Sequence, residues 1–116
     1  MARAVRLRAG SIQSISGESA ARTLADGLRS QSIGPINFEH IRKYVDAIVT
    51  VTEDEIRLAM KKLLFSARIV AEPSGAVTTA AAMFHGREIG ASGTTVAIVS
   101  GGNVDLKLLS EIAAGS

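Results

Sequence analysis

The chain of 116 residues has no cysteine and no tryptophan, and aromatic residues make up 3% of it. Without cysteine, disulfides, thiolate zinc sites and thiol nucleophiles are excluded. The few aromatic side chains, set against 47% hydrophobic residues overall, predict a core of small aliphatic side chains packed between helices and a sheet. A chain of this length has room for one domain with a modest core.

Long apolar runs and a dominant charge of one sign are also missing. No hydrophobic stretch approaches the roughly 20 residues that a membrane-spanning helix requires, so we expect no membrane partner. The formal net charge is +2 at pH 7, and the basic residues are scattered rather than interleaved with aromatic side chains. A nucleic-acid-binding surface needs such a basic stripe, so we expect no nucleic-acid partner.

Residues 1–16 contain several arginines and serines and no acidic residue, which is the composition of a transit peptide. Gly10 and Gly17 would weaken an amphipathic targeting helix. We therefore interpret residues 1–22 as a poorly defined N-terminal segment of a globular, cytoplasmic protein. A misassigned start, with Met1 inside a longer coding sequence, is the alternative.

The clearest helix signal is the capping-box pattern Thr52-Glu53-Asp54-Glu55. The threonine hydroxyl can accept from the Glu55 amide while the Glu55 carboxylate reaches back to the Thr52 amide. Apolar residues then recur on one face at helical spacing. Pro73 should end the helix, because proline disfavours helical angles in the residue before it. The apolar face is formed by Ile56, Met60, Leu63, Ala67 and Val70.

Further helical segments are predicted from caps and apolar periodicity. They are a turn within residues 20–28, a helix over residues 38–45 with Asn37 as its N-cap, a helix from the N-cap Ser74 through Phe84, and a final helix through Ile112 capped by Asp105 or Asn103. The hydrophobic residues that we expect in the core at helical spacing are Met60, Phe65, Met83 and Phe84.

Two short β-branched runs, residues 47–51 and residues 96–99, predict strands, and residues 5–8 alternate in the manner of a short edge strand. Runs that are apolar on both faces are typical of parallel strands covered by helices. The order of elements therefore predicts an α/β domain with parallel strands flanked by helices. Because two strands make an incomplete sheet, the pattern describes part of a larger one.

A polar turn, Ser100-Gly101-Gly102-Asn103, follows the second predicted strand. Ligands of open α/β sheets bind at the carboxyl ends of strands. Two adjacent glycines allow a flat or anionic ligand to approach the backbone because no Cβ intervenes, and Ser100 supplies a hydroxyl. An ordinary strand-to-helix turn contains the same residue types, so both interpretations stay open at this point.

Four stretches, in order and at consistent spacing, resemble the C-terminal half of the large domain in threonine/serine dehydratases and serine racemases. These are pyridoxal-phosphate (PLP) enzymes of fold type II, built like the tryptophan synthase β subunit. The stretches are residues 24–27 (LADG), 46–55 (DAIVTVTEDE), 71–76 (AEPSGA) and 99–105 (VSGGNVD). The resemblance implies that residues 23–116 are the C-terminal part of such a domain and that the missing strands lie earlier in a longer chain.

The same resemblance implies cofactor-binding roles for Ser100, Gly101, Gly27 and Glu72. Ser100 would meet the pyridine nitrogen of PLP, with Gly101 next to it in the turn. Gly27 would lie near the ring, and Glu72 would face the active-site side. PLP is an electron sink that the partner of its ring nitrogen tunes. A neutral hydroxyl does not hold that nitrogen protonated, which suits β-elimination of serine or threonine to a 2-oxo acid and ammonia.

Other parts of the family's active site have no counterpart in this sequence. The Schiff-base lysine, the substrate-carboxylate loop and the phosphate loop precede the matched region, and no glycine cluster here is long enough to cradle a phosphate. We interpret Lys43, Lys61, Lys62 and Lys107 as solvated. We therefore predict no catalytic residue, no metal ligand and no covalently bound PLP in this chain, which would be inactive alone.

Two other classes of function are kept as alternatives. One is a non-catalytic partner or split-enzyme half that completes the sheet of another chain. The other is a nucleotide- or ligand-binding module, against which the absence of a G-x-G-x-x-G pattern argues. For the complete enzyme we expect a small-molecule amino acid substrate and either a homo-oligomer or a complementing chain. The choices between threonine and serine, and between elimination and racemisation, stay open.

The histidines, His40 and His85, are far apart and have no carboxylate or serine at triad-like positions in the sequence. Because acid–base catalysis depends first on geometry, we interpret both as surface or helix-end histidines. The acidic residues that follow Thr52 are explained by the capping box rather than by a metal site.

Overall fold

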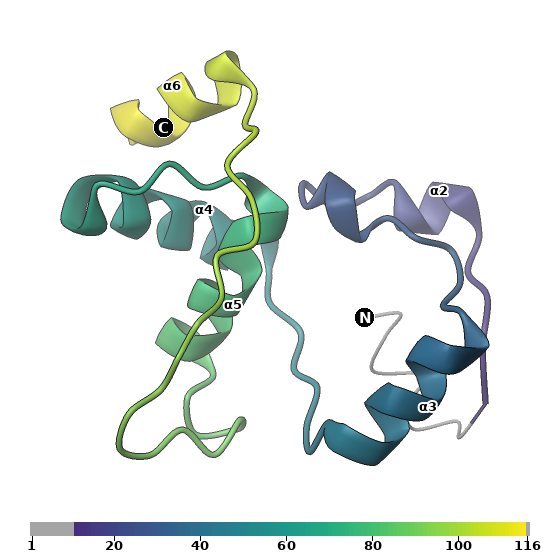
Figure 1. The fold of residues 1–116 in the computed structure, drawn as a ribbon. Helices are drawn as coiled ribbons and strands as arrows, with labels where there is room; N and C mark the ends of the chain where they lie inside the picture. The colour runs from purple at the N-terminus through teal and green to yellow at the C-terminus, as the bar shows by residue number, and fades with distance from the viewer. Residues whose placement is uncertain (1–10, 116) are drawn as a thin grey trace.

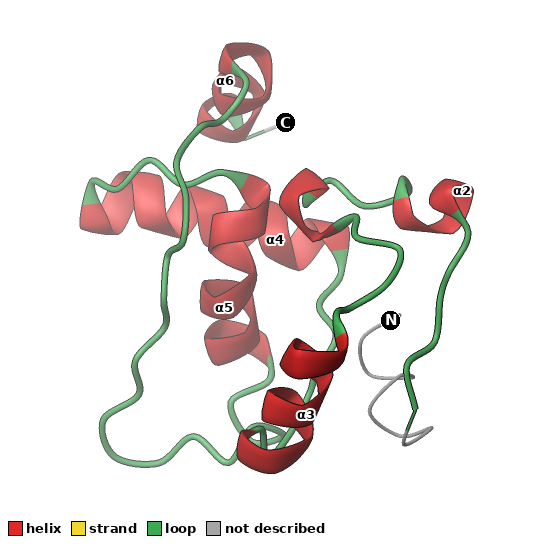
Figure 2. Cartoon of the chain, turned by 45° about the vertical axis from the view of Figure 1, so that its right-hand side comes forward, coloured by secondary structure: helices red, strands yellow, loops and turns green. Residues whose placement is uncertain are grey.

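The computed structural model describes residues 11–115, and every regular element in that range is helical. Figure 1 shows α4, α5 and α6 on one side of the molecule, with α2 and α3 on the other, and Figure 2 shows helices and loops but no strand among the described residues. No helix in the described range is long and apolar enough to cross a membrane. The helices are α2 (Gly17–Ala20), α3 (Pro35–Tyr44), α4 (Glu53–Lys62), α5 (Pro73–Phe84) and α6 (Leu106–Ala114), with a 3-10 turn η1 (Asp26–Leu28) and a π-helical turn η2 (Leu63–Ala67).

The two predicted strands are not formed within residues 11–115. Residues 47–51 lie between α3 and α4, and residues 96–99 run beside α5 (Figure 1), where the Thr78 hydroxyl donates to the Ile98 carbonyl oxygen at 2.7 Å. A strand is defined by backbone hydrogen bonds to a neighbouring strand, and the described range contains no such neighbour. The predicted parallel sheet is thus not confirmed, and the predicted edge strand at residues 5–8 lies outside the described residues.

Residues 96–99 nevertheless keep the side-chain alternation of a strand. Ala97 and Val99 are half-buried, and Val99 packs against the core. Val96 and Ile98, by contrast, are 81% and 70% exposed. Because successive side chains of an extended segment point to opposite faces, one face packs on the helices and the other is an exposed apolar surface.

The core lies where α4 packs on α5 and meets α6, and it consists mainly of small side chains, as predicted. Ala59, Ala76 and Ala80 are fully buried there, and their small size lets the two helix backbones approach closely. Met60 is the largest fully buried side chain, and Ile112 of α6 is 3% exposed.

The predicted capping box of α4 is confirmed, but the helical path ends earlier than expected. Thr52 Oγ1 accepts from the Glu55 amide at 3.2 Å, and the Thr52 amide donates to Glu55 Oε2 at 2.7 Å. The path stops at Ala67 because Arg68 adopts a left-handed conformation with a φ of 60°. Ala67 and Val70 are consequently exposed and do not extend the apolar face.

The starts of two helices differ from prediction because proline takes their first position. Pro73 begins α5 rather than ending the previous helix, with Glu72 at the N-cap and Ser74 inside the first turn. Helix α3 begins at Pro35, upstream of the predicted N-cap Asn37. Proline suits the first helical position because an N–H there would have no helical partner.

Of the two predicted N-cap candidates for α6, Asp105 is the cap and Asn103 is not, because Asp105 Oδ1 accepts from the amides of Lys107 and Leu108 at 2.9 and 3.1 Å. The single helical turn predicted within residues 20–28 is not formed. Instead, α2 ends at Ala20, where the predicted segment begins, and η1 occupies Asp26–Leu28 at its end. The η1 turn lies against α5.

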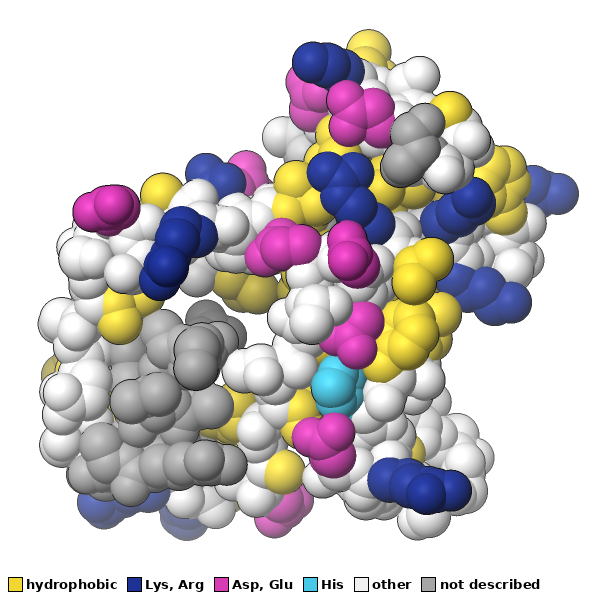
Figure 3. Space-filling view, turned by 180° about the vertical axis from the view of Figure 1, so that it is seen from behind, with side chains coloured by type: hydrophobic (Ala, Val, Ile, Leu, Met, Phe, Trp, Pro, Cys, Tyr) yellow, Lys and Arg dark blue, Asp and Glu magenta, His cyan; other side chains and the backbone are white. Residues whose placement is uncertain are grey.

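Several hydrophobic residues expected in the core lie at the surface. Phe65, Met83 and Phe84 are 47%, 43% and 42% exposed, whereas Met60 is buried. Alanines fill the contact between α4 and α5, so these bulky side chains project from the outer faces of the helices. Their assignment to the core is therefore wrong. Figure 3 shows hydrophobic side chains at the surface of the half of the molecule that holds α4, α5 and α6.

Candidate functional site

The first turn of α5 brings together two segments that are distant in the sequence. One is the Ala25–Asp26–Gly27 turn, and the other is the glycine turn, which we define as residues 100–103. Contacts to these segments come from Glu72, Ser74 and Gly75 at the start of the helix.

Glu72 holds the glycine turn through both its backbone and its side chain. Its amide donates to the Gly101 carbonyl oxygen at 3.1 Å, and its Oε2 accepts from the Asn103 amide at 2.9 Å. A Cβ added at Gly101 would lie 2.6 Å from Glu72 Oε1, closer than side chains tolerate. The missing side chain of Gly101 is therefore what lets the carboxylate reach past it to Asn103.

A second close approach joins Gly75 to the same turn. A Cβ on Gly75, which is buried, would lie 2.5 Å from the Gly101 carbonyl oxygen and 2.9 Å from its nitrogen. Helix and turn thus meet backbone to backbone, an approach that any side chain at Gly75 would block.

Ser74 makes the contact to the other turn. The Gly27 amide donates to Ser74 Oγ at 2.9 Å and to Asp26 Oδ1 at 2.8 Å, and the Ser74 hydroxyl donates to Asp26 Oδ1 at 3.4 Å. Sequence reasoning treated Ser74 as a helix cap and missed this contact. The signal available in the sequence was the position of Ser74 inside the AEPSGA motif, two residues after Glu72 and directly before Gly75.

The structure brings the predicted cofactor-binding residues together as follows. Glu72 and Gly101 are in direct contact, and Gly27 is connected to them through Ser74. Ser100 precedes Gly101, is exposed, and makes no hydrogen bond with any residue in the range 11–115. Their roles toward a cofactor stay predictions, but these residues form one cluster.

A separate polar cluster lies at the other end of α5. His85 Nε2 lies 3.1 Å from Glu55 Oε1, and His85 Nδ1 lies 2.8 Å from Glu88 Oε1. His85 is a helix-end histidine, as predicted. It does have carboxylate neighbours. Glu88 lies three residues further along the sequence, whereas Glu55 comes from another helix and leaves no pattern in the sequence.

The ionisation of this cluster follows from its hydrogen bonds. The bond to Glu88, and then the bond to Glu55, raises the pKa of His85 above its ordinary value of 6.5. The hydrogen bond from the Thr52 backbone amide, assisted by His85, lowers the pKa of Glu55 below its ordinary value of 4.5. The cluster therefore favours a charged histidine between two carboxylates.

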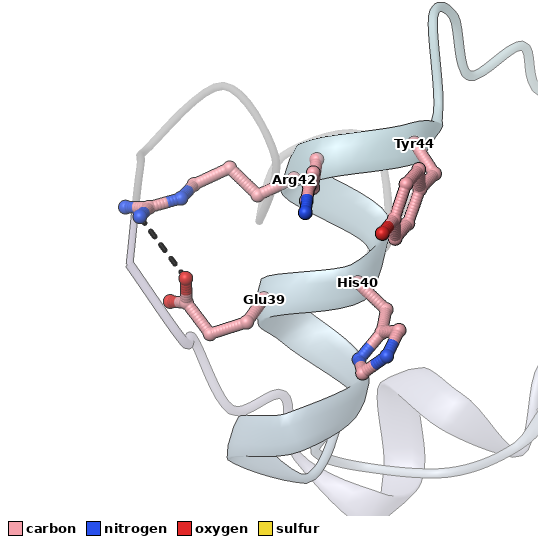
Figure 4. Close-up of a pocket in the computed structure, with 5 residues that line it drawn as sticks. Glu39, His40, Arg42 and Tyr44 are labelled. Atoms are coloured by element: carbon pink, nitrogen blue, oxygen red, sulfur yellow. Dashed lines mark hydrogen bonds and ion pairs between the residues drawn. The ribbon is translucent and has the colours of Figure 1, made fainter.

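A shallow cavity on α3 is unrelated to these clusters (Figure 4). Its lining residues all come from one helix and are Glu39, His40, Arg42, Lys43 and Tyr44. The Arg42–Glu39 ion pair spans 3.0 Å, with both side chains 60% exposed, and such exposed pairs contribute little. None of the predicted site residues lines this cavity.

The lysines, which we interpreted as solvated, are exposed at three of their four positions. Lys43 on α3, Lys62 on α4 and Lys107 on α6 are exposed, whereas Lys61 on α4 is half-buried. No group of three or more His, Asp and Glu residues among positions 11–115 is arranged to hold a metal ion.

Sequence comparison identifies relatives of this chain. The family model described as pyridoxal-phosphate dependent enzyme matches residues 2–101. The L-threonine ammonia-lyase of Thermotoga maritima is 41% identical over 107 residues, which are 91% of this chain and 25% of that protein. The serine racemase of Dictyostelium discoideum is 40% identical over 94 residues, 78% of this chain and 28% of the relative. The chain thus spans about a quarter of the length of these relatives.

Solved structures agree with the sequence relatives. Maize serine racemase superposes with a TM-score of 0.82 at 32% identity, over 98% of this chain and 36% of that one. A threonine deaminase from T.th. superposes with a TM-score of 0.76 at 34% identity, over 90% of this chain and 34% of the other. These neighbours have the fold of type II PLP enzymes. The family match, the identities and the shared fold lead to one conclusion: the chain belongs to the family of pyridoxal-phosphate dependent enzymes.

Proposed function

We propose that residues 23–116 form the wall of a PLP site that faces the cofactor ring in an ammonia-lyase acting on threonine or serine. The observation that carries this proposal is the gathering of Gly27, Glu72 and the glycine turn around the first turn of α5. The names of the relatives, threonine ammonia-lyase and serine racemase, support the substrate class.

The residues in this cluster fit the ring of PLP. The exposed Ser100 hydroxyl is not engaged by any described residue and can hydrogen-bond to a pyridine nitrogen. The exposed Gly27 leaves backbone open to a flat ring. When bound, PLP supplies an electron sink. A neutral hydroxyl at Ser100 leaves the ring nitrogen without a fixed proton, and Glu72 keeps that hydroxyl's turn in place.

We further propose that the chain acts with a second polypeptide segment supplied by a complementing chain, and that the completed enzyme is a cytoplasmic protein that forms homo-oligomers. The lysine and the phosphate loop expected in this family have no counterpart in the sequence. The exposed apolar face at Val96 and Ile98 supports the addition of further structure over residues 96–99, because unpaired extended segments readily pair with another strand.

Reconstitution tests this function. The chain is purified alone and mixed with a polypeptide that carries the remaining part of a related threonine ammonia-lyase, and 2-oxo acid release from L-threonine and L-serine is measured. We expect activity only in the mixture. S100A should strongly reduce this activity, whereas S110A, the same substitution at an exposed serine on α6, should leave it unchanged. Turnover by the chain alone would refute the need for a second segment. A mixture that associates without binding PLP would refute the proposed function.

A further inference from the structure

We propose that Ser74 is a positioning residue that ties the Ala25–Asp26–Gly27 turn to the glycine turn, so that both are set by the first turn of α5. The expected effect on PLP binding rests on the proposed function, whereas the contacts of Ser74 with Asp26 and Gly27 are seen in this chain alone.

The Ser74 hydroxyl is available because it does not cap its own helix. A serine at a helix start ordinarily accepts a hydrogen bond from a nearby amide of that helix. Glu72 takes the N-cap position of α5 instead, and Ser74 lies one residue past Pro73. Its hydroxyl therefore accepts from Gly27, which lies 47 residues away in the sequence, at 2.9 Å.

Both hydrogen-bonding capacities of this hydroxyl are used on the same turn. It accepts from the Gly27 amide and donates to Asp26 Oδ1 at 3.4 Å, while Asp26 Oδ1 also accepts from that amide at 2.8 Å. A hydroxyl is the side-chain group that can donate and accept at one atom. The three groups form a closed ring of contacts that alanine at Ser74 would open and threonine would preserve.

The neighbours of Ser74 carry this constraint to the glycine turn. The N-cap side chain of α5 makes no hydrogen bond to the helix itself, and Glu72 Oε2 instead accepts from Asn103 at 2.9 Å. Gly75, on the other side of Ser74, meets the Gly101 backbone. Three residues within four positions at the start of α5 thus bind the two segments, and a shift of one segment must displace the other.

The consequence is a defined distance between the Gly27 backbone and the Ser100 hydroxyl. In the proposed function, the Gly27 backbone lies against the face of the PLP ring and the Ser100 hydroxyl hydrogen-bonds to its pyridine nitrogen. Ser74 touches neither ring nor substrate, so it acts by positioning. Its loss should weaken PLP binding in the reconstituted mixture without removing any group that contacts the cofactor.

Amide hydrogen exchange followed by NMR on the full chain tests the inference without cofactor. We expect S74A to raise the exchange rate of Gly27 by about fivefold, the factor for one neutral hydrogen bond, and that of Asn103 by a smaller factor. S74T should restore both rates, and S110A should change neither. Met60 in the core of α4 should keep its rate in every variant.

Two outcomes would overturn the role of Ser74. One is an unchanged Gly27 rate in S74A, and the other is an equal acceleration at Met60, which would indicate general destabilisation. PLP affinity of the reconstituted mixture, read from its absorbance, forms the second arm. We expect weaker binding in S74A and recovery in S74T. If no variant binds PLP while the exchange pattern holds, the proposed function fails and the positioning contact stands.

Discussion

The two ends of α5 both reach segments that are distant in the sequence, but by different chemistry. At its start, Glu72 and Ser74 bind backbone amides of turns that carry the candidate cofactor residues. At its end, His85 lies between the carboxylates of Glu55 and Glu88. Contacts to backbone amides define where a turn lies, whereas a histidine–carboxylate contact depends on pH. The start of α5 is thus suited to positioning a site, and its end to joining two helices.

The largest effect is expected from a side chain at Gly75, which would block the backbone contact between α5 and the glycine turn. The added methyl group of G75A would lie 2.5 Å from the Gly101 carbonyl oxygen, so we expect the free energy of unfolding to fall by about 1–3 kcal/mol. Urea unfolding followed by circular dichroism measures it. G86A is the control, because the nearest atom to its added methyl group would be at an ordinary 3.4 Å. If G75A were as stable as the parent chain, the close backbone contact between α5 and the glycine turn would be contradicted.

A smaller loss is expected from removing the carboxylate that holds Asn103. E72A leaves the Asn103 amide without its acceptor, and we expect a loss of about 1 kcal/mol because the site is partly open to solvent. E72Q keeps one oxygen as an acceptor and should lose less. The measurement is again urea unfolding, and a larger loss in E72Q than in E72A would contradict this account.

The end of α5 should respond to pH instead. The pKa of His85 is raised from 6.5 by Glu88 and Glu55, so its stabilising contribution is complete below pH 6.5 and is lost as the pH rises through the raised value. The pKa of Glu55 is lowered from 4.5, chiefly by the Thr52 amide. Its contribution is complete above pH 4.5 and is lost as the pH falls through the lowered value.

The contact should therefore stabilise the chain most between those two pH values, and unfolding free energies measured from about pH 4 to about pH 9 test the expectation. H85Q should remove the decline on the alkaline side. H40Q is the matched control, because His40 Nδ1 contacts the Ile36 carbonyl oxygen and no carboxylate within residues 11–115. A decline that persists unchanged in H85Q would assign the pH dependence to another group.

The smallest effect is expected at the exposed ion pair on α3, which lies away from both ends of α5. E39Q removes the partner of Arg42, but both side chains are 60% exposed. We expect a change in the free energy of unfolding below about 0.5 kcal/mol. Thermal unfolding at low and high salt measures it, and a loss as large as that of G75A would show that α3 is more tightly coupled to the fold than its surface position indicates.

Local signals in the sequence predicted the local features well. The capping box of α4 and the Asp105 cap of α6 involve residues two or three positions apart, so their geometry is encoded in short segments. The glycine turn was identified as a candidate site by its own residues. The family resemblance was likewise carried by short motifs, and the comparisons confirm the family.

Features that depend on distant partners were predicted poorly. Residues 47–51 and 96–99 have the composition of strands, but a strand also needs a neighbour to pair with. Phe65 and Phe84 recur at the spacing of a helix face and were therefore expected in the core. They lie outside it, because alanines already fill the contact between α4 and α5. The contact of His85 with Glu55 crosses 30 residues and leaves no pattern in the sequence.

The sequence by itself determined the family, the helix caps and the residue types at the candidate site, because each depends on short-range hydrogen bonding or on a motif. Only the tertiary structure decided that the side chains of Glu72 and Ser74 bind two separate turns instead of the amides of α5. The physical reason is that a polar side chain at a helix start has competing partners, and packing decides which partner lies within hydrogen-bonding distance.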